Sequence, residues 1–330
     1  MRRTASVLPL ALLGLGVFVL VFGQLLGQYV EPRAKRTPVD VDTTSVLTGT
    51  GSYFDASALA TVDGKQITIT RRIVGDVAAG ERSGNAVWNV STQIDTPKTL
   101  PLRDPRRSLQ WTTERWVTDR RTNLPVHCCG EQPSFRGDAY LKFPFDVRRR
   151  TYTWWDDVLG AAVPLKFTGT TTVLGQEGYV FAGTVAPKPT GVFRQVPGTL
   201  VGRPRQDQVR AEEWYADAGI ELAVERRTGR IMNARIAPKV TLRAPGARHD
   251  AVTLLASDRL EFTDATRRAQ VAQTSRDSRR LEVLGETAPA LGTVAGGVLA
   301  AAGVILLVRG RRRPAVGGAS QAVDRTHTDD

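Results

Sequence analysis

Apolar residues in this chain are concentrated in two continuous runs near its ends, while the long middle part alternates between apolar and polar positions. The runs extend from Val7 to Leu26 and from Ala288 to Val308, and each approaches the roughly 20 residues that a helix needs to cross a bilayer. They predict transmembrane helices over residues 7–27 and 288–308. The first run is longer than the core of a cleaved signal peptide, about 7–15 residues, and lacks a clear A-x-A exit. We therefore expect a retained anchor.

Period-two alternation in the middle part predicts a mainly β fold, with an antiparallel domain over residues 43–262. Residues 66–70 and 87–91, for example, alternate in the way of half-buried strands. Short connections containing Gly, Asn or Asp supply turn residues between such segments. Three hairpins are expected, joining 170–174 to 179–185 across GQEG, 110–117 to 124–127 across TDRRTN, and 221–225 to 231–236 across RRTGR.

The second and third hairpins resemble each other in sequence. WVTDRRTNLPV and LAVERRTGRIM share an acidic residue, two arginines and a threonine before Asn or Gly. A common solution to hairpin formation would explain the match. The pattern also resembles hairpins in bacterial envelope domains of the lipoprotein-carrier type, and that resemblance implies a curved antiparallel sheet around acyl chains.

Two segments connect the predicted domain to the apolar runs. Residues 28–42 contain the Pro-rich and charged stretch from Glu31 to Asp42, which predicts an extended stalk. Residues 263–287 contain no Gly or Pro before Gly285, so they predict a mostly exposed juxtamembrane helix that begins at Thr263 or Asp264 as its N-cap. The basic segment 309–330 ends in small and polar residues, which predicts a disordered tail.

Arginines beside the two runs predict the orientation of the chain in the cell membrane. Positive charge is typical of cytoplasmic flanks, and four arginines directly follow the second run. Arg33, Lys35 and Arg36 favour the opposite orientation, but the arginines after the second run are the clearer signal. We expect a two-pass protein with a large extracytoplasmic domain and cytoplasmic termini, 1–6 and 309–330; the flanking arginines are Arg2, Arg3, Arg309, Arg311, Arg312 and Arg313.

The net positive charge of the chain indicates which partners its outer domain binds. The formal net charge of the 330 residues is +12, and without the seven arginines and three aspartates of the two termini the outer part keeps 38 basic and 30 acidic residues. A domain outside the membrane meets anionic lipid heads and wall polymers rather than nucleic acid. Membrane lipids or cell-wall polymers are therefore the expected partners. The excess of Arg over Lys, 38 to 7, is typical of a GC-rich bacterial genome.

Cys128 and Cys129 are the only cysteines, and they are adjacent. Their Cα atoms are about 3.8 Å apart across a trans peptide bond, below the usual disulfide range of about 4.4–6.8 Å. In an oxidising compartment they can form a vicinal disulfide, remain two buried thiols, or form bridges to another chain. His127 beside them does not complete a metal site, because three consecutive residues do not readily converge on one tetrahedral ion.

The sequence predicts no enzyme and no cofactor. It contains no G-x-S-x-G elbow, no zinc-protease motif and no G-x-x-x-x-G-K phosphate loop. An envelope hydrolase would have to use His127 or His249 with Asp156, and this remains the weakest alternative.

Small residues recur at four-residue spacing in both apolar runs, at Gly23 and Gly27 and at Gly292, Gly296 and Ala300. Such faces let helices approach closely, so the two spans can pack on each other, on another copy of the chain, or on another membrane protein. Neither span contains an ionisable residue, which argues against an ion path through these two helices.

The segment LKFPFDVRRRTYTWWD resembles an actinobacterial membrane family that is named after the porin PorA and whose domain has no known function. The resemblance implies an envelope protein, and the family name implies a wall porin. A membrane β-barrel, however, needs no helical anchors and alternates lipid-facing with polar residues, whereas Arg71 and Arg72 place charge on both faces of a strand. The motif residues are Phe143, Pro144, Phe145, Asp146, Tyr152, Trp154, Trp155 and Asp156.

The leading hypothesis from sequence is an envelope protein whose outer β domain binds a lipid or envelope glycopolymer without catalysis. Its basic surface, its Trp and Tyr content and its membrane tethers motivate this hypothesis. Permeation through a pore formed by oligomers is the second hypothesis, followed by the hydrolase and by a structural partner of another membrane protein.

Overall fold

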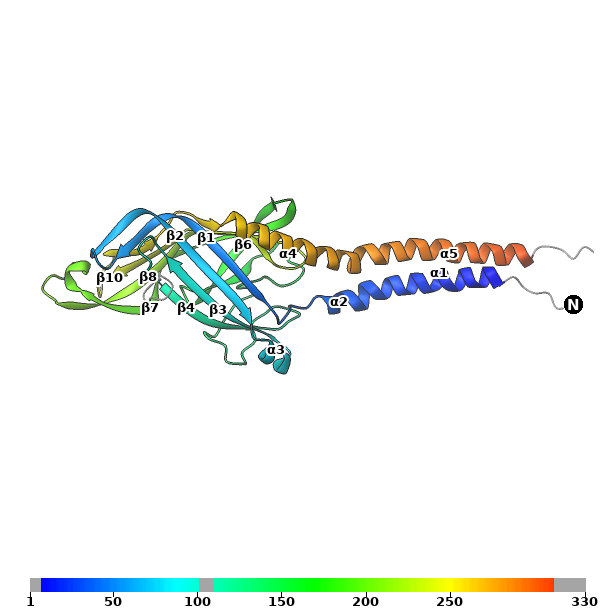
Figure 1. The fold of residues 1–330 in the computed structure, drawn as a ribbon, viewed down its shortest axis with the longest axis horizontal. Coiled ribbons are helices and arrows are strands. Elements are labelled where there is room, and N and C mark those ends of the chain that lie inside the picture. Colours follow the sequence, from blue (N-terminus) through cyan, green and yellow to red (C-terminus); the bar gives the residue numbers. More distant parts are fainter. Residues whose placement is uncertain (1–6, 101–109, 312–330) are drawn as a thin grey trace, which may run out of the picture. The chain divides into compact units, whose positions relative to one another are not determined.

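The computed structural model describes residues 7–100 and 110–311. The chain forms two compact units, one from the segment up to Ala34 together with the segment from Glu282 onward, and the other from Lys35 to Leu281. The first unit is helical and the second is mainly antiparallel β-sheet (Figure 1). The prediction of a mainly β chain with an apolar helix at each end is thus confirmed.

The helical unit contains α1 (Val7–Leu25), the π-helical turn η1 (Leu26–Val30), α2 (Glu31–Ala34), the π-helical turn η3 (Val283–Thr287) and α5 (Ala288–Arg311). Both long helices are apolar enough to cross a membrane. A proline follows each π-helical turn after one intervening residue. It is Pro32 after η1 and Pro289 after η3. The helix is continuous through each proline: the Glu31 amide bonds to the Leu26 carbonyl and the Ala288 amide bonds to the Val283 carbonyl. These longer π-type hydrogen bonds just before each proline let the helix continue past a residue that has no N–H.

This continuity explains a correction to the predicted stalk. Residues 28–34 are helical rather than extended, because the π-helical turn η1 accommodates Pro32 and lets the helix continue to Ala34. The chain becomes non-helical after Ala34 and enters β1 at Asp42.

In the described part of the β unit, twelve strands form one sheet with the order β4-β3-β2-β1-β11-β10-β8-β7-β6-β5, and β9 and β12 pair with each other beside β8 and β1. Named neighbours run antiparallel, as in the pairs β1 with β2 and β7 with β8. The strands are β1 (Asp42–Asp55), β2 (Ala60–Gly75), β3 (Ala86–Asp95), β4 (Gln110–Thr118), β5 (Tyr152–Asp156), β6 (Ala161–Val173), β7 (Gln176–Pro197), β8 (Gln208–Val224), β9 (Ile231–Ile236), β10 (Pro238–Arg243), β11 (Val252–Ala256) and β12 (Leu260–Phe262).

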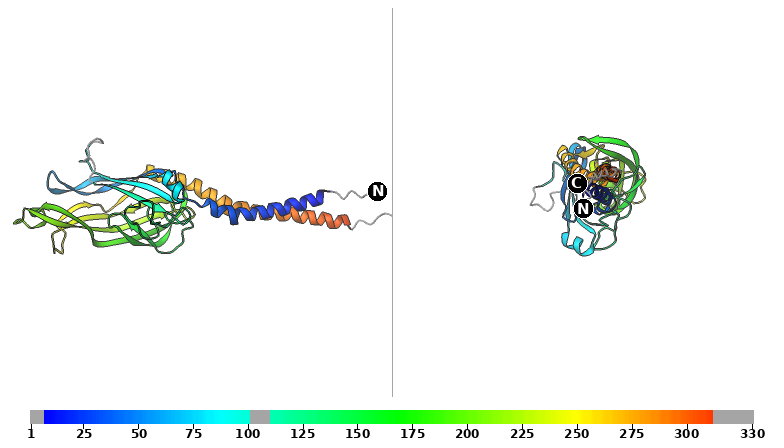
Figure 2. Two further views of the ribbon diagram at one scale, coloured as in Figure 1. Left: turned by 90° about the horizontal axis from the view of Figure 1, so that it is seen from below. Right: turned by 90° about the vertical axis from the view of Figure 1, so that its right-hand side faces the viewer.

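The sheet folds over, so that its two halves face each other as layers (Figure 2, left). One apolar cluster joins Ile67 and Ile69 of β2 to residues of the other half, including Phe181 of β7 and Leu222 of β8. Phe143, from the irregular segment before β5, lies in this cluster and stacks on Phe181 with ring centroids 4.9 Å apart. Aromatic rings therefore occupy the space where the carrier analogy places acyl chains.

Two of the three predicted hairpins form as paired strands. In β6–β7 the turn is tighter than predicted, because Leu174 and Gly175 both adopt positive φ and reverse the chain in two residues. In the remaining hairpin, across TDRRTN, the second strand does not form and only an isolated bridge joins Thr118 to Pro125. Pro125 has no N–H with which to continue the ladder.

Two short helices and one long helix complete the β unit: α3 (Val77–Ser83), the 3-10 turn η2 (Gly198–Val201) and α4 (Asp264–Glu282). The sequence left α3 unpredicted, although Asp76 caps it by accepting a hydrogen bond from the Ala79 amide. α4 corresponds to the predicted juxtamembrane helix, and its N-cap is Thr263, whose hydroxyl accepts from the Thr266 amide at 3.2 Å.

Candidate functional site

Apart from the exposed Asp146, the PorA-like motif lies inside the β unit rather than on its surface. Phe143, Tyr152 and Trp155 are buried, while Pro144, Phe145 and Trp154 are partly buried. The Phe143 ring contacts those of Tyr152 and Trp154 at centroid distances of 5.2 and 5.8 Å. The motif thus fills the core between the two halves of the sheet.

The two similar turns of the sequence have the same local structure. In the first, a carboxylate oxygen of Asp119 accepts hydrogen bonds from the amides of Arg121 and Thr122 and from the Thr122 hydroxyl. In the second, Glu225 accepts from the corresponding groups of Arg227 and Thr228. Asn123 and Gly229 then follow at equivalent places with φ of 61° and 70°. The shared letters therefore encode a carboxylate-capped turn that ends in the left-handed region.

Both turns hold the backbone of the motif. The Asn123 side chain donates to the Lys142 carbonyl at 2.9 Å, and the Gly229 carbonyl accepts from the Phe143 amide at 2.8 Å. A Cβ on Gly229 would overlap the carbonyl oxygens of Phe143 and Pro144. Glycine is therefore required here both by its φ and by the close approach of the motif.

Lys142 is buried between the turns without a direct carboxylate partner in the hydrogen bonds of the described residues. Its Nζ donates to Thr37 Oγ1 at 3.1 Å and lies 3.6 Å from the centroid of the Phe145 ring. Burial and, to a smaller extent, the charge of nearby Arg230 lower the pKa of Lys142 to about 7, while Asp277 opposes the change.

The motif also joins the segment that follows the first apolar helix. Lys35 Nζ pairs with Asp146 Oδ2 at 2.5 Å. Thr37 exchanges two hydrogen bonds with Arg120, from the Thr37 amide to the Arg120 carbonyl and from Arg120 Nε to the Thr37 carbonyl, each 2.7 Å long.

α4, which precedes the second apolar helix in sequence, is joined to the other turn. Ser278 Oγ donates to Glu225 Oε1 at 2.9 Å, and Arg230 pairs with Asp277 at 3.5 Å. We call this assembly the junction. It connects the motif, both turns and the two segments leading to the apolar helices, and comprises Lys35, Thr37, Asn123, Lys142, Phe143, Asp146, Glu225, Gly229 and Ser278.

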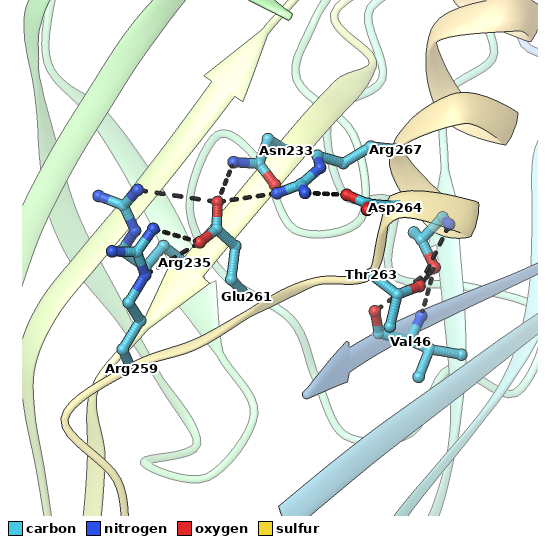
Figure 3. A network of polar contacts seen from close by, with 9 residues as sticks. Val46, Asn233, Arg235, Arg259, Glu261, Thr263, Asp264 and Arg267 are labelled. Carbon is cyan, nitrogen blue, oxygen red and sulfur yellow. Dashed lines mark hydrogen bonds and ion pairs between the residues drawn. The ribbon is translucent and has the colours of Figure 1, made fainter. Parts of the chain in front are cut away.

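A second polar cluster fixes the start of α4 (Figure 3). Glu261 of β12 accepts from Asn233 at 2.9 Å and pairs with Arg235, Arg259 and Arg267 at 3.7, 2.5 and 3.0 Å. Arg267 also pairs with Asp264, the first residue of α4. One carboxylate therefore links β9, the turn before β12 and the first turn of α4.

At the same end of α4, the hydroxyl of Thr266 accepts a hydrogen bond from the Val46 amide at 3.0 Å. This contact joins the helix to β1. Thr263, which caps α4, also donates its amide to the Val46 carbonyl at 2.9 Å. The Glu261 cluster and these backbone contacts together position α4 on the sheet.

A third network contains ionisable groups inside the folded sheet. Arg71 of β2 pairs with Asp157, just after β5, at 2.5 Å, and Tyr140 donates its hydroxyl to Glu114 of β4 at 2.5 Å. Burial raises the pKa of Glu114 to about 7, and the Asp157 charge contributes in the same direction. This network ties strands from opposite halves of the sheet.

Asp156 of the motif has its own buried partner. Tyr215 of β8 donates its hydroxyl to Asp156 Oδ2 at 3.0 Å, and the other Asp156 oxygen caps the turn through the amides of Val158 and Leu159. Burial and the Asp157 charge raise the pKa of Asp156 to about 7.

One outward face of the sheet combines aromatic rings with arginines. On β8, Arg210, Glu212 and Trp214 occupy alternate positions, with Phe193 of β7 and Arg243 of β10 opposite Glu212. The guanidinium carbon of Arg210 lies 4.3 Å from the Phe193 ring centroid, and that of Arg243 lies 3.7 Å from the Trp214 ring centroid. We call Phe193, Arg210, Trp214 and Arg243 the aromatic–arginine face.

In the helical unit, α1 and α5 pack through their small residues. A Cβ on Gly292 would lie 3.0 Å from Gly23 Cα, one on Gly296 would lie 2.7 Å from the Gly16 carbonyl oxygen, and one on Gly16 would overlap the Ala300 backbone. A Cβ on Gly27 would meet the Pro289 ring at 3.0 Å. The structure therefore places the stripes of one chain against each other.

Comparison with known proteins identifies the family. A family model described as Porin PorA matches residues 8–305. The chain belongs to the Porin PorA family. A curated Porin PorA from Corynebacterium resistens is 26% identical over 229 residues, which cover 57% of this chain and 54% of that protein. The chain thus spans about half the length of this curated relative.

Family membership confirms the resemblance that the motif indicated, and with the two apolar helices it makes this chain a membrane protein. Within this PorA-family chain, the Sγ atoms of Cys128 and Cys129 lie next to each other beside Val117 and Val126, so their positions are compatible with the predicted vicinal disulfide. Asn85 donates to Cys128 Sγ at 3.5 Å, and Arg115 donates to the Cys129 carbonyl at 2.8 Å. The oxidised state stays a prediction until the thiols are measured.

The structure does not assemble the hydrolase that the sequence left open. His127 is exposed and pairs with Glu131 at 2.6 Å, whereas Asp156 is buried on Tyr215. His249 lies on the exposed stretch before β11. Among residues 7–100 and 110–311, no group of three His, Cys, Asp or Glu side chains is placed to hold a metal ion.

Sequence reasoning missed the role of the two turns and the Glu261 cluster. The sequence contains the repeated D/E-R-R-T pattern, but the pattern does not indicate that both turns bind the same motif. Lys142 directly precedes the Phe-Pro-Phe-Asp stretch. A lysine within such an apolar run is the sequence feature that could have indicated a buried amine.

Proposed function

We propose that this PorA-family protein is a two-pass envelope protein whose outer β domain binds an anionic lipid or glycopolymer of the envelope without catalysis. The observation that carries the proposal is the aromatic–arginine face on β7, β8 and β10. Both termini are proposed to be cytoplasmic, supported by the arginines that follow the second span.

The exposed Arg210 is the residue of this face that offers positive charge to a ligand, because the Arg243 side chain is 14% exposed and already pairs with Asp250 at 2.8 Å. Phe193 and Trp214 add ring surface beside it. Phe193 is 46% exposed, and the neighbouring Val192 is 45% exposed. Arginine matches phosphate and carboxylate with paired donors, and tryptophan and arginine are the residues that most often dominate binding surfaces. Stacking on the rings also fixes the guanidinium planes before a ligand arrives.

The experiment is to purify the full chain from its native envelope in a mild neutral detergent and identify co-purifying lipids and saccharides by mass spectrometry. We expect Trp214→Ala, and Phe193→Ala combined with Arg210→Gln, to retain at least about fivefold less ligand. Trp111→Ala is the matched control, because Trp111 is 50% exposed on β4. Equal retention by all variants, or absence of any bound lipid or saccharide, refutes the proposal.

Permeation by oligomers is the second candidate, favoured by membership in a family described as porins. The α1–α5 seam is closed by backbone contact, so a pore would require several copies. Gly14 and Gly297 face open space in the single chain and could form contacts between copies. Planar-bilayer recordings test this candidate: conductance lost in Gly14→Leu supports it, and a silent bilayer with the pure wild-type protein rejects it.

A further inference from the structure

α4 has two different faces. The face that packs on the sheet is lined by small or polar residues and one leucine, all buried, and includes Ser278 of the junction. Its buried members are Thr266, Val271, Thr274, Ser278 and Leu281.

The opposite face is strongly basic. Arg268, Arg276, Arg279 and Arg280 are exposed and recur at spacings of eight, three and one residues, which places them on the same side of a helix with 3.6 residues per turn. Small alanines at 265, 269 and 272 separate them and leave the guanidinium groups accessible. We call these four residues the α4 arginine face.

The aspartates of α4 do not neutralise this face. Asp264 pairs with Arg267 in the Glu261 cluster, and Asp277 pairs with Arg230 beside the junction. Both carboxylates are thus directed to partners other than the four exposed arginines.

The face is also close to the membrane along the chain. Arg280 precedes Ala288, the first residue of the second apolar helix, by eight residues, and α4, η3 and α5 follow one another without an intervening loop. Even a fully extended segment of that length reaches only about 28 Å, and a helical one about 12 Å. Head groups and the interfacial region are about 5–8 Å thick on each side of the hydrocarbon core, and the potential of an anionic surface extends about a further 10 Å at ~0.1 M salt. At helical spacing, Arg279 and Arg280 therefore lie within reach of this surface.

We infer that the α4 arginine face binds the anionic head groups of membrane phospholipids. Charge complementarity and chain proximity to a membrane span select this occupant, because anionic lipid surfaces attract juxtamembrane basic segments. The inference does not depend on the ligand of the aromatic–arginine face, which lies on other elements.

The test titrates the full chain in neutral detergent micelles with phosphatidylglycerol, and separately with phosphatidylcholine, and counts bound lipids by native mass spectrometry. We expect tighter binding of phosphatidylglycerol, weakened when ionic strength rises from about 0.1 M to about 0.5 M. The variant that replaces all four arginines by Gln should lose at least about tenfold in phosphatidylglycerol affinity. Its changes are Arg268→Gln, Arg276→Gln, Arg279→Gln and Arg280→Gln.

A matched control removes the same charge from other exposed positions and should bind phosphatidylglycerol like the wild type. Equal losses in both variants would mean a general charge effect and would overturn the inference. So would an unchanged affinity in the α4 variant, the result expected if the face instead binds a protein. The control combines Arg82→Gln, Arg136→Gln, Arg205→Gln and Arg248→Gln, all at exposed residues.

Discussion

At the scale of single residues, the buried amine of Lys142 makes stability depend on pH. Its pKa is about 7 in the folded state, below its ordinary value of 10.5, so between these values the unfolded state binds more protons. Stability should therefore rise as pH increases from about 7 towards 10. Lys142→Met should abolish this rise in Tm, measured by tryptophan fluorescence on the full chain in detergent between pH 6.5 and 9.5. The exposed Lys188→Met is the control; an undiminished rise in Lys142→Met would contradict the assignment.

Glu114 makes stability depend on pH in the opposite direction, and at lower pH than Lys142 does. Its folded pKa of about 7 lies above its ordinary 4.5, so the folded state binds more protons between these values and stability falls as pH rises. Asp156, with a pKa also near 7, contributes in the same sense. Glu114→Gln should reduce the fall in Tm between pH 5 and 7, and adding Asp156→Asn should reduce it further. Glu81→Gln, at an exposed position on α3, should leave it unchanged.

At the scale of elements, the TGR turn between β8 and β9 depends on Gly229 for two reasons that can be separated. Gly64 shares its positive φ, 66° against 70°, but a Cβ at Gly64 has no neighbour within 4 Å. Gly64→Ala should therefore show only the backbone cost, about 1–2 kcal/mol. Gly229→Ala adds overlap with the motif and should cost at least about 3 kcal/mol in the free energy of unfolding, measured by denaturant titration. Similar losses in the two variants would argue against close packing of turn and motif.

The two apolar helices offer a similar comparison. A Cβ at Gly16 overlaps the Ala300 backbone, whereas one at Gly14 meets no atom within 4 Å. Gly16→Leu should separate α1 from α5 and abolish a disulfide crosslink engineered across the seam, while Gly14→Leu should preserve it. Crosslinking that survives in Gly16→Leu would place the seam elsewhere.

These elements show where sequence reasoning succeeds and where it ends. Local patterns predicted the apolar helices, two of the three hairpins, and Thr263 as one of two candidate caps, because periodicity and turn chemistry act over a few residues. The stalk was wrong over residues 28–34, because a π-helical turn before Pro32 lets the helix continue past it. The junction could not be predicted, because Lys142 and Thr37 meet across 105 residues of sequence and only the folded sheet brings them together.

At the scale of the whole molecule, the orientation in the membrane determines the redox state of Cys128 and Cys129. If the β unit lies outside the cytoplasm, the vicinal disulfide persists, and if it lies inside, reducing systems keep the thiols free. Intact cells should therefore show no labelling of these cysteines by a membrane-impermeant maleimide, and should show it after treatment with an impermeant reductant. The pair is partly buried, so labelling is quantified after rapid denaturation of the quenched sample and compared with a Cys128→Ser, Cys129→Ser variant as background.

The intact mass should also be about 2 Da lower without reductant than with it. Thiols that are already free yet protected from the impermeant reagent would place the β unit in the cytoplasm, and would remove the basis for an envelope ligand at the aromatic–arginine face.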